Sequence, residues 1–284
     1  MAITAAQVNE LRQKTGAGMM DCKKALTEAN GDFEKAIEIL RKKGASVAAK
    51  RAEKSANEGM VKTKISADKS TGFIVEVNCE TDFVAKSNDF IDFTEEVLIA
   101  VESKKPVNVQ ELLGDSGLKN KMTDLLGKVG EKIEVSRFAI EKAVEGIIVD
   151  YVHLGSKLGV LVRFDNAGKA ADNLAEMGKD IAMQVAAMSP ICVKRDEVPQ
   201  EVINKEIEIY KEISRKEGKP ENILDKIAQG KLNKYYQENC LVEQAFIKDN
   251  SKNVGDLLKE FNSKHGTNAS IKLFHRFHLG DEKK

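Results

Sequence analysis

The residues best suited to chemistry at a surface form one short run, Glu80-Thr81-Asp82-Phe83-Val84. The run follows an apolar stretch, residues 73–79, that is predicted to be a strand. Thr81 is expected to cap a short helical turn that contains Asp82, because its hydroxyl can accept a hydrogen bond from a free backbone amide. Phe83 then lies at an exposed junction between loop and helix, which is an unusual place for an aromatic side chain.

A second exception to local rules is the pair Met19 and Met20. Neighbouring side chains on a helix point about 100° apart, so both cannot face one small core. We expect one of them to be exposed, where methionine is a soft contact for a partner surface. The alternative is a methionine at the start of a helix that lies on the linker.

The rest of the chain lacks the signatures of an active site. HExxH, GxSxG, GxxxxGK[ST] and GxGxxG motifs are absent. His275 and His278 are three residues apart on an expected strand, so they would lie on opposite faces and form no metal site. The acidic residues show no desolvated pair. We therefore predict no catalytic residue, no metal, no cofactor and no enzyme activity.

The composition excludes several further classes of protein. The 284 residues include 45 basic and 45 acidic side chains, and a net charge of zero argues against bulk binding to nucleic acid or an anionic membrane. No apolar run reaches the length of a membrane span, and no signal peptide is visible. The four cysteines form no CxxC pair, which favours free thiols in a reducing compartment, and hence a soluble cytoplasmic protein.

The zero net charge is a cancellation between segments. Residues 1–55 hold 11 basic and 7 acidic residues, a net of +4, whereas residues 56–150 hold 12 and 18, a net of −6. Such an asymmetry can steer a charged partner, but it is also found on ordinary patchy surfaces.

Helical periodicity predicts three short helices within the first 44 residues. The third buries Phe33, Ala36, Ile37 and Leu40 and is expected to end at Gly44, after three cations at the negative end of the helix dipole. These helices would form a compact headpiece. Residues 45–58 have few large apolar side chains and are predicted to be a linker, in part helical.

The following core contains one motif twice, 87 residues apart. Residues 58–61 align with residues 145–148, and residues 72–75 align without a gap with residues 159–162. Each copy reads as a β-hairpin followed by an amphipathic helix. Low identity leaves chance similarity as the alternative. The helix positions expected to be buried are Phe90, Phe93, Val97 and Val101 in the first copy, and Leu174, Met177, Ile181, Val185 and Met188 in the second.

The repeat also provides a control for the run at Glu80. At the offset of 87 residues, the second copy has Gly168-Lys169-Ala170, which contains neither an acid nor an aromatic residue. If the shared fold required Phe83, the second copy should keep a large side chain there. This favours a special role for Phe83. The alternative is that Phe83 packs on an element unique to the first copy.

Two charged amphipathic segments, interrupted at residues 218–220, predict an antiparallel helical hairpin at about residues 199–236 that projects from the body. A β-like run, residues 271–279, follows. The predicted fold is therefore α+β: a three-helix headpiece and linker at 1–55, and then two related subdomains with small antiparallel sheets. The first spans residues 56–140. The second spans residues 141–284 and contains the hairpin as an insertion.

Two long motifs resemble the signatures of bacterial translation elongation factor Ts: LRQKTGAGMMDCKKAL at residues 11–26 and EVNCETDFVAK at residues 76–86. The resemblance extends over nearly the whole chain. It implies a guanine-nucleotide exchange factor for elongation factor Tu, the GTPase that delivers aminoacyl-tRNA. Such a factor binds the GDP-bound GTPase, disturbs its Mg²⁺ and phosphate site, and promotes GDP release so that GTP can bind.

The resemblance also assigns roles to residues. In that family the segment that corresponds to Thr81, Asp82, Phe83 and Val84 inserts into the GTPase near its magnesium site.

The family further implies that Met19 and Met20 on the headpiece pack against a helix of the same GTPase domain. Tyr151 and His153 of the second subdomain would face the partner. The partner is expected to be elongation factor Tu, in a heterodimer or a two-to-two complex, with no direct contact to nucleic acid or membrane.

The chain departs from the family at two points. Glu80 stands where glutamine is common, which would add a charge beside Asp82, and the sequence stops soon after Leu279, without the further helix of many relatives. Partner affinity is then expected to be lower, or to depend more on the headpiece and core. A rival hypothesis is a non-catalytic adaptor, because a three-helix headpiece also resembles ubiquitin-associated domains.

Overall fold

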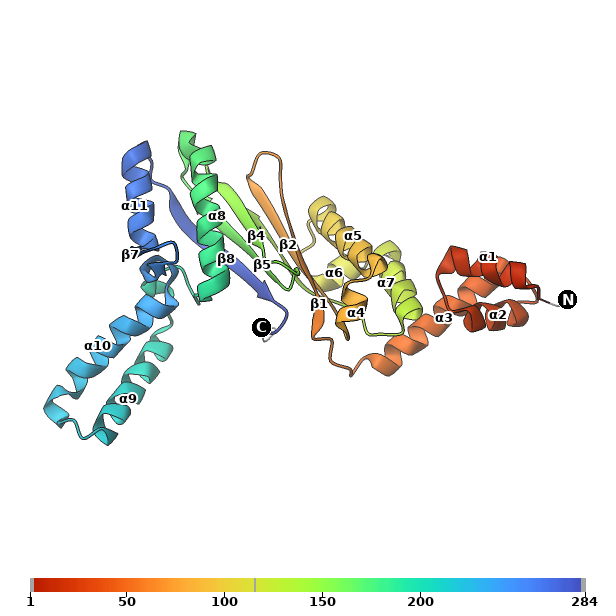
Figure 1. The fold of residues 1–284 in the computed structure, drawn as a ribbon, viewed down its shortest axis with the longest axis horizontal. Helices are drawn as coiled ribbons and strands as arrows, with labels where there is room; N and C mark the ends of the chain where they lie inside the picture. The colour runs from red at the N-terminus through yellow and green to blue at the C-terminus, as the bar shows by residue number, and fades with distance from the viewer. Residues whose placement is uncertain (1–2, 115, 282–284) are drawn as a thin grey trace.

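The computed structural model describes residues 3–114 and 116–281 and confirms the predicted α+β class. The headpiece, here defined as α1 (Ala5–Thr15), α2 (Met19–Glu28) and α3 (Phe33–Arg51), lies at one end of the molecule (Figure 1). Thr4 and Gln7 form a capping box at the start of α1, since each side chain accepts from the other's backbone amide. Small apolar side chains around Leu11 and Leu26 form the headpiece core.

The prediction that the third helix ends at Gly44 is wrong, because α3 continues to Arg51. Gly44 is buried within the helix against α7 (Ser116–Val129). A Cβ atom at Gly44 would lie 3.0 Å from the Thr123 carbonyl oxygen and 3.6 Å from the Cα atom of Gly127. Gly44 therefore permits a close approach of two helices, and α3 forms a continuous helical connection between the headpiece and the body.

The first half of the body is an antiparallel sheet with helices on one face. Its strand order is β1 (Glu58–Ile65), β2 (Thr71–Cys79) and β3 (Glu134–Lys142). The covering helices are α4 (Asp82–Ala85), α5 (Asn88–Lys104), α6 (Val109–Gly114) and α7. All four apolar positions predicted to be buried in α5 are buried.

The second half repeats this plan. Its strand order is β4 (Ile147–Val152), β5 (Leu158–Asp165) and β8 (Ser270–His278). A short 3₁₀ turn, η1 (Gly168–Ala170), leads into α8 (Ala171–Met188), and α11 (Val254–His265) lies beside it (Figure 1). A two-stranded ribbon, β6 (Ala245–Phe246) and β7 (Asp249–Asn253), precedes α11. Met188 was expected to be buried but is 47% exposed at the end of α8.

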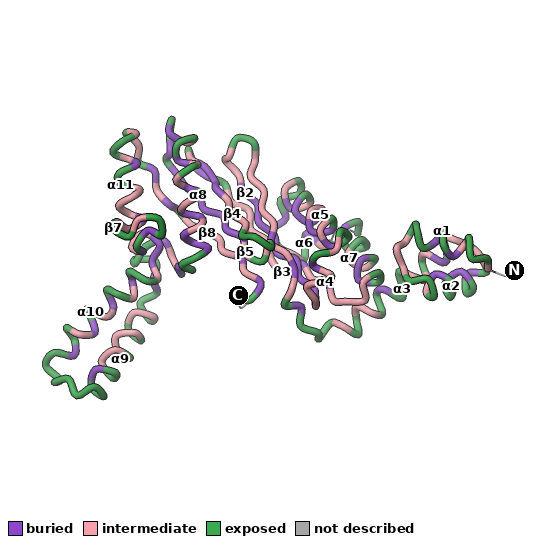
Figure 2. The backbone as a smooth tube through the Cα atoms, viewed as in Figure 1, coloured by how far each residue is buried: buried purple, intermediate pink, exposed green. Residues whose placement is uncertain are grey.

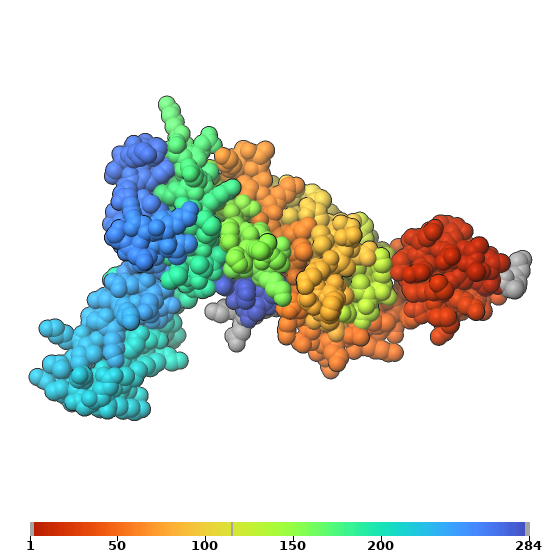
Figure 3. Space-filling view, viewed as in Figure 1, coloured from red at the N-terminus to blue at the C-terminus, as the bar shows by residue number. Residues whose placement is uncertain are grey.

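The predicted helical hairpin consists of α9 (Gln200–Lys216) and α10 (Glu221–Asn239). It extends from the body at the end opposite the headpiece (Figure 3). Most of its residues are exposed or half-buried (Figure 2). At its base, Val198, Leu232, Tyr236 and Cys240 form a small buried cluster that joins the hairpin to the body.

The two halves share their strand register as well as their order. Met60 pairs with Val77 in the first hairpin, and Ile147 pairs with Phe164 in the second, 87 residues further on in each strand. The pairing with the third strand shifts at equivalent points, between Glu76 and Val77 and between Arg163 and Phe164. Bulges at the same offset support a duplicated unit over chance similarity.

The two sheets pack against each other through equivalent residues. Val61 and Ile74 of the first sheet lie in one buried cluster with their counterparts, Ile148 and Leu161, of the second. Near the centre of this interface, the Thr63 hydroxyl donates to Asp150 at 2.6 Å, and these two positions are also 87 residues apart. The division of the chain into domains at residues 55 and 140 stays a prediction; β3 extends two residues beyond the second boundary.

Candidate functional site

The run at Glu80 forms a rigid turn that presents an exposed aromatic ring. Thr81 caps α4 as predicted, and its hydroxyl accepts from the Val84 amide at 3.4 Å. The Thr81 amide and hydroxyl also donate to the Glu131 carboxylate at 3.0 and 2.7 Å. Phe83, on this turn, is 83% exposed. The structure thus fixes the backbone beneath Phe83 while leaving its side chain in solvent.

Asp82 lies beside Phe83 and carries a negative charge. Its carboxylate accepts from the Lys86 ammonium group at 2.7 Å, one turn further along. This hydrogen bond lowers the pKa of Asp82, and Lys157 of the second half lowers it further. Exposed pairs of this kind add little stability. The pair therefore fixes the position of the Asp82 carboxylate more than it stabilises the fold.

Glu80 was expected to add a charge beside Asp82, and in the structure its carboxylate is paired. Its carboxylate accepts from Arg51 at 2.8 and 2.7 Å, and from the Lys132 amide at 2.7 Å. Burial disfavours the charged form, but these donors outweigh it and hold the pKa of Glu80 below its ordinary value. Glu80 therefore ties the end of α3 to the base of the turn.

The turn between β4 and β5 presents the second group of predicted residues. The hydroxyl of Tyr151 and Nδ1 of His153 are 2.8 Å apart, so the two side chains share one face of the strand end. The His153 amide donates to the Leu158 carbonyl and closes the turn. Leu154 at the tip is 95% exposed. Sequence reasoning missed Leu154, although a large apolar residue directly before Gly155-Ser156 was the available signal.

The structure brings the turn at Phe83 and the β4–β5 turn together. The Val61 amide donates to the Ser156 carbonyl at 2.7 Å, and Lys157 pairs with Glu58 at 2.6 Å. A mostly apolar hollow of about 260 Å³ separates the two turns, with Asp82 and Lys86 on one side and residues 155–157 on the other. The turns that carry Phe83 and Leu154, one from each half, therefore border a common hollow.

Met19 and Met20 lie apart from this surface, at the start of α2 in the headpiece. Both are exposed, at 54% and 63%, where sequence reasoning expected at least one.

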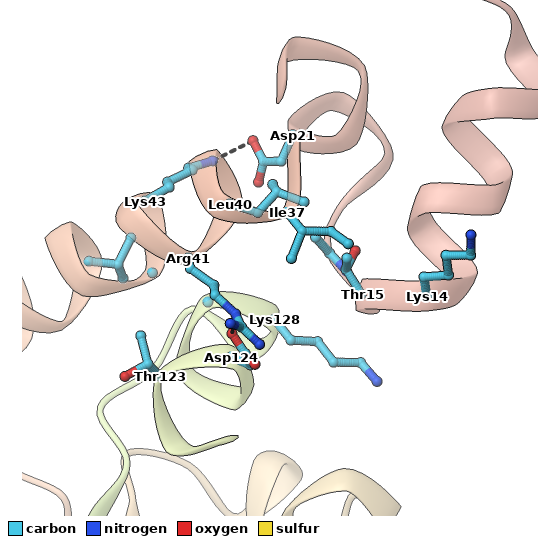
Figure 4. A pocket seen from close by; sticks show the side chains of 14 residues that line it. Lys14, Thr15, Asp21, Ile37, Leu40, Arg41, Lys43, Thr123, Asp124 and Lys128 are labelled. Atoms are coloured by element: carbon cyan, nitrogen blue, oxygen red, sulfur yellow. Dashed lines mark hydrogen bonds and ion pairs between the residues drawn. The ribbon is translucent and has the colours of Figure 1, made fainter. Parts of the chain in front are cut away.

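A cavity of about 350 Å³ separates the headpiece from α7 (Figure 4). Charged side chains from both sides line it. Arg41 of α3 faces Asp124 of α7 at 3.5 Å, and Lys43 pairs with Asp21 within the headpiece. Contact between headpiece and body is therefore concentrated at α3 and α7.

Within the described ranges, no three His, Cys, Asp or Glu side chains lie close enough together to hold a metal ion. The thiol of Cys79, beneath the turn, is buried, and burial raises its pKa to about 12, so it stays protonated. No helix in the described part of the chain is both long and apolar enough to cross a membrane.

Exposed apolar anchors on fixed turns, with a charged neighbour and shallow hollows, are typical of a surface that binds another protein. The geometry is therefore that of a surface suited to contact with another protein. A model of the family described as elongation factor TS matches residues 80–281, beginning at the Glu80 turn.

Relatives named elongation factor Ts align over almost the whole chain. The one from Chloroherpeton thalassium is 45% identical over 99% of both chains, and the one from Prosthecochloris aestuarii is 46% identical over 98% of this chain and 99% of its own. The one from Clostridium perfringens strain SM101 is 45% identical over 98% of this chain and 93% of its own. The chain belongs to the elongation factor Ts family and is a factor of translation elongation in protein biosynthesis.

Proposed function

We propose that this chain is a guanine-nucleotide exchange factor for elongation factor Tu. It binds the GDP-bound GTPase, disturbs the Mg²⁺ and phosphate site, and promotes GDP release, without catalysing a chemical reaction. The observation that carries the proposal is Phe83, an 83% exposed ring on a turn clamped by Glu131, in a member of this family.

A rigid turn suits this task because an exchange factor acts only through its preference for the nucleotide-free state. A GTPase holds its nucleotide through a phosphate loop and a bridging Mg²⁺. A ten-thousand-fold decrease in the affinity of the GTPase for its nucleotide requires about 5.5 kcal/mol. Burial of Phe83 in the partner supplies about 1.5–3 kcal/mol. Phe83 is therefore an anchor that requires help from other contacts.

We assign the other contacts to Asp82 beside Phe83, to the β4–β5 turn and to the start of α2 in the headpiece. Asp82, held by Lys86, places a negative charge next to the inserted ring, where it disfavours the arrangement of ligands around Mg²⁺. Tyr151, His153 and Leu154 extend the same surface into the second half. Met19 and Met20 add a separate apolar contact on the headpiece.

The direct test is the rate of GDP release from elongation factor Tu. The GTPase is loaded with a fluorescent GDP and mixed in a stopped-flow instrument with excess unlabelled GDP, with and without this chain. We expect a large acceleration that saturates with the concentration of the chain. An unchanged release rate would overturn the proposal.

A binding experiment separates exchange from a simple adaptor role. The complex with elongation factor Tu should form in the absence of nucleotide and dissociate when GDP and Mg²⁺ are added, because binding of factor and nucleotide is reciprocally coupled. Sedimentation of the complex would distinguish a one-to-one from a two-to-two assembly. An adaptor would bind its partner equally well with and without GDP.

A further inference from the structure

The base of the α9–α10 hairpin holds two cysteines side by side. Cys192 lies in the segment that enters the hairpin, and Cys240 lies directly after α10, 48 residues later. Their Sγ atoms are 3.5 Å apart. The other two cysteines lie elsewhere: Cys22 in the headpiece core and Cys79 beneath the turn at Phe83. The pair at the hairpin base is therefore a distinct arrangement within the molecule.

The backbone already has a geometry that accepts a bond between these sulfurs. Cys192 and Cys240 form a parallel bridge. The Leu241 amide donates to the Cys192 carbonyl at 2.9 Å, and the Ile191 amide donates to the Asn239 carbonyl at 2.9 Å. Backbones paired in this way lie about 5 Å apart, within the range of about 4.4–6.8 Å between Cα atoms that a disulfide requires. Closure thus needs rotation of side chains rather than movement of the chain.

The two thiols differ in their access to solvent. Cys192 is half-buried, whereas Cys240 is fully buried. A small oxidant can therefore reach Cys192 first, and Cys240 is positioned to react with the product.

We propose that Cys192 and Cys240 form a redox modification site, at which exchange with a low-molecular-weight disulfide such as oxidised glutathione creates an intramolecular disulfide across the base of the hairpin. The thiolate of Cys192 attacks the small disulfide, whose S–S bond breaks; a mixed disulfide forms, and one small thiol leaves with the proton that Cys192 lost. Cys240 then loses its proton and attacks Sγ of Cys192, and the second small thiol leaves with that proton. Two protein thiols are oxidised, and one disulfide is reduced to two thiols.

The surroundings of the pair make this reaction slow at neutral pH. Burial raises the pKa of both thiols, that of Cys240 to about 12. The acids Asp196, Glu197 and Glu243 face the pair and disfavour a thiolate, whereas Arg195 favours one at Cys240. Tyr236 lies under the Arg195 guanidinium at 4.7 Å, and Tyr235 is the neighbouring titratable group. Closure should therefore accelerate as the pH rises and should respond to sustained oxidation.

The bond would enclose the whole hairpin in a covalent ring. The segments that enter and leave the hairpin are now held by hydrogen bonds, the bidentate pair of Arg195 with Glu243, and the small cluster around Tyr236. A disulfide would keep these segments together when that packing loosens. The hairpin would then retain its orientation on the body under conditions in which the reduced form opens locally.

The test uses the full chain treated with oxidised glutathione at mildly alkaline pH. We expect the thiols titrated after denaturation to fall from four to two, and a peptide map to show one cross-link, between the peptides of Cys192 and Cys240. Limited proteolysis within the hairpin should become slower and should recover on reduction. Retention of four thiols, a persistent mixed disulfide, or a cross-link to Cys22 or Cys79 would each overturn the proposal.

Variants resolve the order of the steps. Cys240→Ala should stop at a mixed disulfide on Cys192, and Cys192→Ser should leave Cys240 unmodified. Cys22→Ala is the matched control, because it removes a buried thiol remote from the hairpin. This variant should still form the disulfide between Cys192 and Cys240. The cross-link in the unmodified sequence is decisive even where a variant fails to fold. This inference is independent of the proposed exchange activity.

Discussion

The two halves of the body are built on one plan but use equivalent positions for opposite purposes. After β2 the chain makes a capped helical turn that exposes 83% of Phe83; after β5 it makes a 3₁₀ turn whose equivalent residue, Ala170, is 5% exposed. Ala170 belongs to the core beneath α8, and Phe83 belongs to no core cluster. The fold thus requires only a turn at this position, and in the first half that turn carries an exposed aromatic ring.

The two halves share the glycines that allow their strands to pack closely against each other. Gly72 meets Ile148 across the sheet interface, and Gly159 meets Val61, so that a Cβ atom at either glycine would lie 2.5 Å from a methyl group of the opposite sheet. The features that differ, such as the clamp of Thr81 by Glu131, are local polar contacts. Duplication therefore preserved packing constraints and left the turns free to diverge.

The largest expected effect is a loss of stability when a glycine that both halves share is replaced. Gly59 is the second residue of β1, and Gly146 lies at the equivalent position just before β4. A Cβ atom would collide with the Val77 carbonyl oxygen in one case and with the Phe164 carbonyl oxygen in the other. Because the obstacle is backbone, Gly59→Ala and Gly146→Ala should each lower the free energy of unfolding by about 3 kcal/mol. Urea denaturation followed by circular dichroism measures this loss.

Gly230→Ala is the control for this pair, since nothing lies within 4 Å of a Cβ atom at that position in α10. Alanine in an open helical position should stabilise the chain by about 0.5–1 kcal/mol. A strong effect at only one of Gly59 and Gly146 would break the structural equivalence of the halves.

The second prediction tests the exposed side chain of Phe83, which has no counterpart in the second half. Phe83→Ala should leave the fold intact and reduce the stimulation of GDP release about tenfold to hundredfold, since it removes roughly 1.5–3 kcal/mol of burial in the partner. Stopped-flow release of labelled GDP measures the reduction.

Val107→Ala is the matched control for Phe83. Val107 is 85% exposed on the loop after α5, and the length of that helix separates it from the Phe83 turn by about 25 Å. Val107→Ala should leave exchange unchanged. Equal losses in the two variants would show that exposed apolar area in general, and not the Phe83 turn, drives binding.

Much of this organisation could be predicted from the sequence because it rests on short-range patterns. The cap at Thr81 and the buried face of α5 depend on residues close together in the chain, and the 87-residue repeat is a comparison of two such short patterns. The errors arose where a distant residue decides the outcome. Gly44 resembled a helix end because its tight contact, with Thr123, lies on another helix.

Two further features of the site depended on distant partners in the same way. Glu80 was expected to add a charge beside Asp82, but its partners were not predicted, because neither Arg51 nor the Lys132 amide is near it in the sequence. The proximity of the β4–β5 turn to the Phe83 turn arises from the packing of two sheets, which was not predicted from the sequence.

The third prediction concerns the clamp that only the first half has. Glu131→Ala removes the acceptor for the Thr81 amide and hydroxyl, so the turn beneath Phe83 should become less ordered. A hydrogen-bonded clamp of this kind contributes about 1 kcal/mol, and exchange should fall about fivefold. Glu111→Ala is the control, because Glu111 accepts the Val107 amide at 2.8 Å in a loop remote from the site. Equal activity of both variants would show that the clamp does not position Phe83.

The smallest effect concerns the turns that connect the two strands of each hairpin, β1 to β2 and β4 to β5. Lys69 and Ser156 occupy equivalent positions with φ angles of 58° and 56°, but the preceding residue is Asp68 in the first half and Gly155 in the second. Asp68 accepts from the Ser66 hydroxyl at 2.6 Å and from the amide and hydroxyl of Ser70 at 3.1 and 2.9 Å. These hydrogen bonds lower the pKa of Asp68 to about 2.

Because the folded pKa lies below the ordinary value of 3.8, the turn gains stability from Asp68 above pH 3.8 and loses it as the pH falls through about 2. We expect the carboxyl carbon resonance of Asp68 to show a mainly ionised group at pH 3, where an ordinary aspartate is mainly protonated. Ser70→Ala removes one hydroxyl donor and should move the midpoint upward. A midpoint near 3.8 in the unmodified chain would show that the serines do not hold the carboxylate, and that the first turn, like the glycine turn of the second half, is fixed by its backbone alone.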